Sequence, residues 1–303
     1  MLVSTTFVGM ATWLAHGTCT QLVQLFPPRA MVQVQLGFQL SNILALILVL
    51  AMRVTSYDIN DSQIDYFYGI AAVIVVAGCF SWLAFLGRTA DAPLRLELRD
   101  SSHILKAEDD DPDQPLLTTQ SADLNSLPDE FAEPFNEGLN YCVLSIFINI
   151  FSSNLMGAFF AYIPKDEIGK IATVLVFCRL ISDATSRFVA YIWRPSFCDT
   201  PSALFTSSVV RAASMAVFFA YAVGAFKADW FIMAFVFVSG FLSGILGTFS
   251  YVASREICLV LPEEYREEAF AKSSFRMNIS FNSGGFVSSI VSIAIAVFIK
   301  IVT

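Results

Sequence analysis

The sequence predicts an all-α, polytopic membrane protein with eight transmembrane helices. Of its 303 residues, 56% are hydrophobic and only 15% are charged, and the mean hydropathy is +0.64. Soluble domains average about 45–50% apolar and about 25% charged residues. This composition excludes a soluble enzyme, a secreted disulfide scaffold and a disordered protein. The lipid bilayer is therefore the first partner that we expect for the chain.

Eight segments are apolar enough to cross a bilayer, which takes about 20 residues. The third and the eighth segments carry the clearest signal. The first is interrupted by His16 and two glutamines, and the fifth contains three charged side chains. The predicted spans are 3–24, 32–52, 66–87, 139–163, 169–193, 204–226, 229–254 and 278–301.

One long acidic connection separates the spans into two groups. Residues 91–138 hold thirteen acids against Arg95, Arg99 and Lys106, a net charge of −10, whereas the whole chain carries −8. Such a segment cannot bury enough apolar surface to fold by itself. We therefore expect a partial N-terminal bundle of three helices (1–87), an acidic disordered cytoplasmic loop (88–138) and a C-terminal bundle of five helices (139–303).

Lysines and arginines set the expected orientation, because they favour the cytoplasmic ends of spans. With the long loop in the cytoplasm, ten of them lie at inner ends and five at outer ends. Both termini then lie outside, which is unusual for a chain that starts directly with a hydrophobic helix. One explanation of this topology is that the chain is a fragment of a longer protein whose earlier spans are missing. The charge outside the loop is only +2, so no basic surface for nucleic acid is predicted.

The chain lacks the short motifs of hydrolytic and metal-dependent enzymes. It has no P-loop, no G-x-S-x-G elbow and no H-E-x-x-H pair. The six cysteines are scattered without a C-x-x-C pair and are interpreted as packing thiols. His16 and the nearby Cys19 belong to no cluster of three or more histidines and cysteines in the sequence, and protein metal sites have at least three such ligands. We therefore predict that the protein is not an enzyme and needs neither a cofactor nor a metal.

Charged residues inside the fifth span are the strongest candidates for a site. Asp183 is the only acid in the interior of a predicted span, since Asp229 stands at the first position of the seventh. Arg179 and Arg187 lie four residues before and after Asp183, on the same helix face. An ionisable group near the bilayer centre costs about 3 kcal/mol or more, so it faces the protein interior or a wet cavity. Arg211 in the sixth span adds another charge. These residues form either an ion-pair clasp between helices or the polar wall of a solute pathway.

Polar and small residues in other spans have two interpretations. His16 is the only histidine in a span, where it serves as a helix–helix hydrogen bond or as a solute contact. Small faces of membrane helices are most often packing surfaces, which we predict for Gly240, Gly244 and Gly247. Pore lining and packing remain equal alternatives for the mixed stripe of the fourth span, formed by Asn149, Ser152, Ser153, Met156 and Phe160.

Several segments together resemble the equilibrative nucleoside transporters. HGTCTQLVQLFPPRAMVQVQLGFQLSNILALI resembles that family's fourth and fifth helices, and FCRLISDATSRF resembles the D-x-x-G-R motif of the eighth through Asp183 and Arg187. SSVVRAASM resembles the start of the ninth helix, DWFIMAFVFVSGFLSGILGTFSYV the tenth and SFNSGGFVSSIVSIAI the eleventh. The acidic loop falls where the family has its large cytoplasmic loop. The resemblance thus covers helices four to eleven in order, without the first three.

The resemblance implies a fold, a function and a set of binding residues. The fold would be a major-facilitator-like pair of helical bundles, and the function facilitated diffusion of nucleosides or nucleobases. Arg187 would donate to the ribose hydroxyls, Asp183 would hold that guanidinium, His16 would contact the base edge and Phe160 would stack on the base. The chain departs from the family at His16, which replaces a glutamine, at Ser186, which replaces the motif glycine, and at Arg179, an additional charge.

Two alternatives to this function remain. Three spans cannot form the family's six-helix N-terminal half, so a truncated, non-transporting paralogue that serves as a membrane subunit or assembly partner is one of them. A carrier for another small polar solute is the other. The plasma membrane is the expected location. Residues 113–117, DQPLL, resemble an acidic dileucine signal, which would direct the protein to endosomal or lysosomal membranes.

Overall fold

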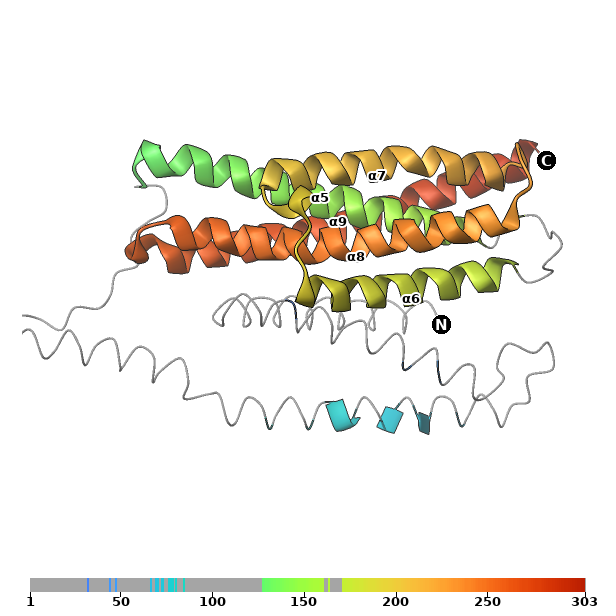
Figure 1. Cartoon of the computed structure of the whole chain (residues 1–303), viewed down its shortest axis with the longest axis horizontal. Coiled ribbons are helices and arrows are strands. Elements are labelled where there is room, and N and C mark those ends of the chain that lie inside the picture. Colours follow the sequence, from blue (N-terminus) through green and yellow to red (C-terminus); the bar gives the residue numbers. More distant parts are fainter. Residues whose placement is uncertain are drawn as a thin grey trace, which may run out of the picture. The chain divides into compact units, whose positions relative to one another are not determined.

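The computed structural model describes residues 127–160, 163 and 171–302, with isolated positions at 32, 44, 47, 66, 69, 70, 72, 73, 76–78, 80 and 84. This part of the chain is all helical and contains no sheet, which confirms the predicted class. Its elements are α5 (Asp129–Phe159), α6 (Ile171–Ile192), the 3₁₀ turn η3 (Ser196–Cys198), α7 (Pro201–Ala222), α8 (Asp229–Val260) and α9 (Glu263–Val302) (Figure 1). The predicted spans 3–24, 32–52 and 66–87 lie outside the described helices.

Four of these helices are long and apolar enough to cross a membrane. They are Asp129–Phe159, Pro201–Ala222, Asp229–Val260 and, within α9, Glu263–Ile295. The protein is therefore an integral, multi-pass membrane protein. The predicted fifth span is also a helix, α6, but it is not one of the four. Its three charged residues at 179, 183 and 187 set it apart, because they fall within any 18-residue stretch of this 22-residue helix.

Two helices begin earlier than the sequence predicts. α5 starts at Asp129 rather than 139, so the last ten residues assigned to the disordered loop are helical. α9 starts at Glu263 rather than 278. Acidic residues open both helices, Asp129 and Glu130 in one and Glu263 and Glu264 in the other. Carboxylates near a helix N-terminus are stabilised by the helix dipole, so these polar turns continue the helices beyond their apolar stretches.

The start of α7 follows a capping pattern that can be read in the sequence. Thr200 has an extended backbone, and its hydroxyl accepts a hydrogen bond from the backbone N–H of Ala203 at 3.3 Å. Pro201 occupies the first helical position, where its missing N–H has no intrahelical acceptor to lose. The chain leaves α7 through Gly224, whose φ of +78° suits a glycine.

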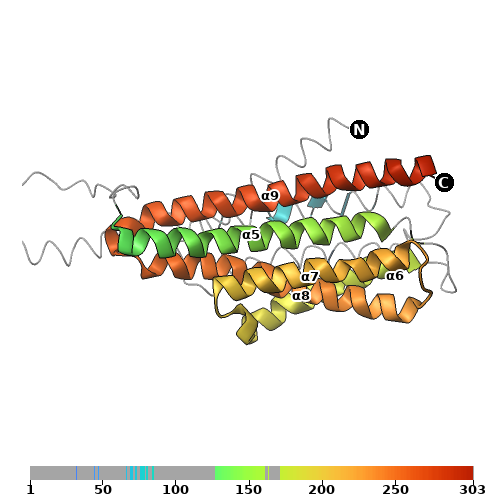
Figure 2. The ribbon, with the colours of Figure 1, turned by 90° about the horizontal axis from the view of Figure 1, so that it is seen from above.

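α5 and α8 form the centre of the described bundle, and α8 contacts all four other helices. α5 is the second of these central helices. It packs against α9, α7 and α8, whereas α6 packs chiefly against α8 (Figure 2). Large side chains fill these interfaces, with Met156 of α5, Phe218 of α7 and Ile232 of α8 fully buried. Other large apolar side chains stay exposed, as Trp230, Phe286 and many others do. Such outward apolar faces are typical of helices that contact lipid.

The contact between α6 and α8 is made by small residues. Gly240 and Gly244 of α8 face Ser182 and Ser186 of α6, and both pairs are spaced by four. A Cβ at Gly240 would collide with the Ser182 hydroxyl, and one at Gly244 with the Ser186 hydroxyl. This spacing allows two backbones to approach closely. The predicted packing role of these glycines is confirmed.

One end of α6 is attached to α8 by an arginine. Arg194 follows α6, and its Nη1 and Nη2 donate to the two carboxylate oxygens of Glu256 at 2.7 and 3.0 Å. Arg194 also donates to the backbone oxygen of Cys198 in η3 at 2.9 Å, and its guanidinium lies 5.5 Å from the centroid of the Phe249 ring. The turn between α6 and α7 is thereby fixed against α8.

Candidate functional site

A cavity of about 400 Å³ lies between α5, α6 and α8. Small-molecule sites usually enclose about 300–1,000 Å³. The polar side chains of the cavity wall come mainly from α5 and α6, and α8 adds Ser243 and Tyr251. Its polar lining from α5 and α6 consists of Asn149, Ser153, Asn154, Arg179, Asp183 and Arg187. A cavity with charged groups inside a membrane bundle is the natural candidate for a solute site.

The α6 side of the cavity carries its charges. Arg179, Asp183 and Arg187 all line it, in agreement with the shared helix face that their spacing predicts. The Asp183 Oδ2 and Arg187 Nη2 atoms are 3.6 Å apart, and their side chains are only 19% and 12% exposed. This pair fits both sequence interpretations so far, since an ion pair can also form a cavity wall.

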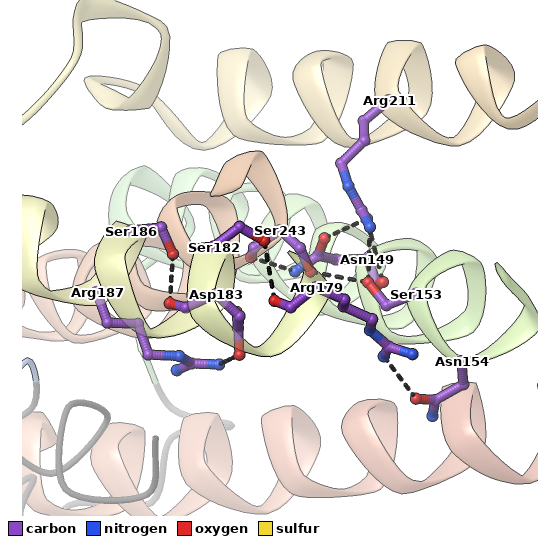
Figure 3. A network of polar contacts seen from close by, with 10 residues as sticks. All are labelled: Asn149, Ser153, Asn154, Arg179, Ser182, Asp183, Ser186, Arg187, Arg211 and Ser243. Carbon is purple, nitrogen blue, oxygen red and sulfur yellow. Dashed lines mark hydrogen bonds and ion pairs between the residues drawn. The ribbon is translucent and has the colours of Figure 1, made fainter. Parts of the chain in front are cut away.

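Arg179 reaches across the cavity to α5. Its Nη2 donates to the side-chain oxygen of Asn154 at 3.4 Å (Figure 3). The guanidinium occupies the space beside Gly157, where any Cβ would collide with Nη1. Gly157 therefore makes room for the arginine. Sequence reasoning missed this pairing, although Asn154 and Gly157 lie three residues apart on one face of α5.

Arg211 lies one layer behind the cavity. It is 2% exposed, and its Nε donates to the backbone oxygen of Ser239 at 2.9 Å. Its Nη1 donates to Asn149 Oδ1 at 2.6 Å and to Ser152 Oγ at 2.9 Å, and its Nη2 donates to Ser153 Oγ at 2.7 Å. Figure 3 shows the side chain reaching from α7 toward α5. Arg211, which the sequence analysis grouped with the charges of the polar wall, thus does not line the cavity. It holds the side chains of the wall in place from behind.

The polar stripe of α5 serves both of its alternative roles. Asn149 and Ser153 line the cavity and also bind Arg211. The Asn149 side-chain nitrogen donates to the backbone oxygen of Ser243 at 2.8 Å, and the hydroxyls of Ser153 and Ser243 are 2.8 Å apart. Met156, by contrast, is fully buried in the apolar core. Packing and lining are therefore divided among the residues of the stripe.

The two candidate base contacts have different outcomes. Phe160 lies at the cavity wall but is only 3% exposed. Its ring packs edge-on against Phe218, with the ring centroids 5.7 Å apart and an interplanar angle of 70°. His16 lies outside the described residues. Tyr251, which the sequence analysis did not single out, also lines the cavity.

Side chains that commonly bind metals are dispersed in the described part of the chain. There, no group of three or more His, Cys, Asp or Glu residues is placed to hold a metal ion. The donors that converge on the cavity are guanidinium, amide and hydroxyl groups, which bind oxygen-rich organic solutes.

Comparison with models of protein families, with curated proteins and with solved structures found no match to this chain. The class of protein therefore follows from the helices alone, which define an integral, multi-pass membrane protein with a polar cavity inside its bundle.

Proposed function

We propose that this protein is a facilitative carrier that moves nucleosides or nucleobases across a membrane by alternating access. The observation that carries this proposal is the polar cavity between α5, α6 and α8, which contains Asp183, an acid from the middle of a predicted span. A protein that merely spans a bilayer has no need of a charged interior cavity, because each such group is costly to bury. The resemblance of the ordered motifs to the equilibrative nucleoside transporters supplies the solute class.

The roles of the cavity residues follow from their chemistry. Arg187 would donate to vicinal ribose hydroxyls, since its planar fork presents parallel N–H groups. Asp183, 3.6 Å from that guanidinium, would orient it and accept from the sugar. Asn149 and Ser153, held by Arg211, would offer fixed amide and hydroxyl groups. Phe160 would pack against the base from the cavity wall, and His16 would contact the base edge from the N-terminal bundle.

Alternating access requires that the cavity opens to each side in turn. The helices α5–α9 would form one bundle of a major-facilitator-like pair, and the spans within 1–87 would contribute to the other. Rocking of one bundle against the other around a site near the midplane is the usual mode of such carriers. The inward face of α6, with its three charged residues, would then meet the solute in both states.

Uptake of labelled adenosine, uridine and hypoxanthine into proteoliposomes containing the full chain tests this proposal. We expect time-dependent uptake that excess unlabelled solute abolishes. Arg187→Ala should remove it while the protein still reconstitutes, and Arg187→Lys should also fail because an ammonium ion cannot replace the planar fork. Lys227→Gln, which removes a charge from the exposed connection between α7 and α8, is the matched control.

Two results would contradict the proposal. Normal uptake by Arg187→Ala would exclude the site assignment. Absence of uptake of all three solutes by a well-folded chain would instead favour the alternative of a non-transporting subunit.

A further inference from the structure

The cavity and its supporting layer carry more positive than negative charge. Arg179, Arg187 and Arg211 face a single carboxylate, that of Asp183, which leaves a net charge of +2. The two acids of α8, which also borders the cavity, bind other groups. Asp229 accepts from the Tyr221 hydroxyl at 2.6 Å, and Glu256 binds Arg194.

Among the residues that the structure describes, Arg179 and Arg211 donate their hydrogen bonds to neutral acceptors, and they share the single carboxylate of Asp183 as a nearby opposite charge. Arg179 donates to the amide oxygen of Asn154, and Arg211 donates to amide, hydroxyl and backbone oxygens. The predicted spans outside the described part, 3–24, 32–52 and 66–87, contain no aspartate or glutamate. A countercharge from within the membrane is therefore not available from those spans either. Arg211 is buried and Arg179 is partly buried. Three cations that share one carboxylate in such positions are costly, so the arrangement favours an anion from outside the chain.

Arg211 supports the polar wall of the cavity through Ser153. Ser153 Oγ accepts from Arg211 Nη2 at 2.7 Å, and it lies 2.8 Å from Ser243 Oγ, where either hydroxyl can donate to the other. The Ser243 hydroxyl lines the cavity and has a proton that it can donate to a solute there. Asn149 is fixed in the same way, since its oxygen faces Arg211. The cavity thus presents donors from α8 as well as from Arg179 and Arg187.

We infer that the cavity binds the anionic group of its solute, a phosphate or a carboxylate, on the side formed by Arg179 and Ser243. Such an oxyanion has several acceptor lone pairs and matches both the guanidinium fork and a hydroxyl donor. This inference rests on the proposed transport function and narrows its substrate class from neutral nucleosides to their anionic relatives, such as nucleoside monophosphates or carboxylated bases.

Two matched pairs of probes test the inference. Adenosine and adenosine monophosphate differ by a phosphate, and uracil and orotate differ by a carboxylate. Binding of each labelled compound to the purified full chain in nanodiscs gives a ratio of dissociation constants within each pair. We expect the anionic member of at least one pair to bind tenfold or more tightly than its neutral partner, as a charge-assisted hydrogen bond provides. The pair that shows the effect identifies phosphate or carboxylate as the preferred group.

Three variants connect the preference to the cavity. Arg179→Gln keeps a hydrogen-bonding side chain near Asn154 and should reduce the ratio to about one. Arg179→Lys keeps the charge and should retain most of the preference, which guards against a general folding defect. Lys227→Gln removes the same unit charge at an exposed position and should leave the ratio unchanged.

The outcomes separate this inference from the proposed function. Equal binding of both members in both pairs, together with uptake of adenosine, would overturn the anion site and leave the carrier intact. Anion preference that persists in Arg179→Gln would also overturn it. Absence of binding and uptake for all four probes would overturn both.

Discussion

Gly244→Ala tests whether the close approach of the α6 and α8 backbones requires a glycine at this position. A Cβ at Gly244 would lie 2.7 Å from Asp183 Oδ1 and 2.9 Å from the Asp183 backbone oxygen, whereas ordinary contact begins at 3.4 Å. The serine hydroxyl nearby can rotate away, but the backbone oxygen cannot. Restoring ordinary contact with the Asp183 backbone oxygen requires the two backbones to separate by about 0.5 Å, the difference between 3.4 and 2.9 Å. Overpacking of this kind costs about 1–3 kcal/mol.

Gly285→Ala is the matched control for this substitution. The nearest atom to a Cβ at Gly285 is Asn154 Nδ2 at 3.5 Å, so the methyl group fits. Both substitutions gain about 1 kcal/mol of helix propensity, because glycine is the poorer helix former. The difference between the two variants therefore isolates the collision. We expect Gly244→Ala to have a free energy of unfolding about 1–3 kcal/mol lower than Gly285→Ala.

Unfolding in mixed micelles, followed by circular dichroism as a denaturing detergent is added, measures this difference. A second variant, Gly244→Ala with Ser186→Gly, removes the hydroxyl collision but not the backbone one, so it should recover only part of the loss. Equal stability of Gly244→Ala and Gly285→Ala would refute the close approach of the two backbones.

Three further predictions concern Arg211, Arg194 and Cys198. Arg211→Lys should lower the free energy of unfolding by about 2 kcal/mol or more in the same titration, because one ammonium group cannot satisfy the acceptors that the guanidinium serves; an unchanged midpoint would contradict this. The side chains of Arg194 and Glu256 are 30% and 41% exposed, so their ion pair should contribute little. A double-mutant cycle of Arg194→Ala and Glu256→Gln should give a coupling energy of only about 0.5–1 kcal/mol. A coupling energy above about 3 kcal/mol would show instead that the pair is screened from water. Burial raises the pKa of the Cys198 thiol from 9.0 to about 12, so the reactive thiolate forms only in strong alkali. A single-cysteine chain that retains Cys198 should therefore react with maleimide at pH 8 far more slowly when folded than after denaturation, and equal rates would refute the burial.

The positions of the described helices were predictable to the extent that they depend on apolar length. Each of the five predicted C-terminal spans corresponds to a helix, α5–α9. The ends of the helices were less predictable, because hydropathy indicates which residues can lie in the apolar core of the bilayer and not where a helix begins or ends. The polar turns that open α5 at Asp129 and α9 at Glu263 are helical without being apolar.

The candidate site was predictable only along single helices. The spacing of Arg179, Asp183 and Arg187 correctly places them on one face, since that depends on the helical repeat alone. Which residues of other helices meet that face depends on packing between segments distant in sequence. The bond from Arg179 to Asn154 and the position of Arg211 behind the wall belong to this second kind.

The small-residue contact between α6 and α8 also has a mechanical consequence. The hydroxyls of Ser182 and Ser186 donate back to the backbone oxygens of Arg179 and Asp183 within α6, at 2.9 and 2.6 Å, rather than across to α8. A contact of glycines and inward-bonded serines is held by dispersion forces, and it lacks large interlocking side chains. Because each serine hydroxyl occupies the space beside a glycine, the contact fits in one register of α6 against α8, and the bond from Arg194 to Glu256 holds the same register at the end of α6. These two helices are therefore expected to move as one unit, which the bond from Arg179 to Asn154 connects to α5.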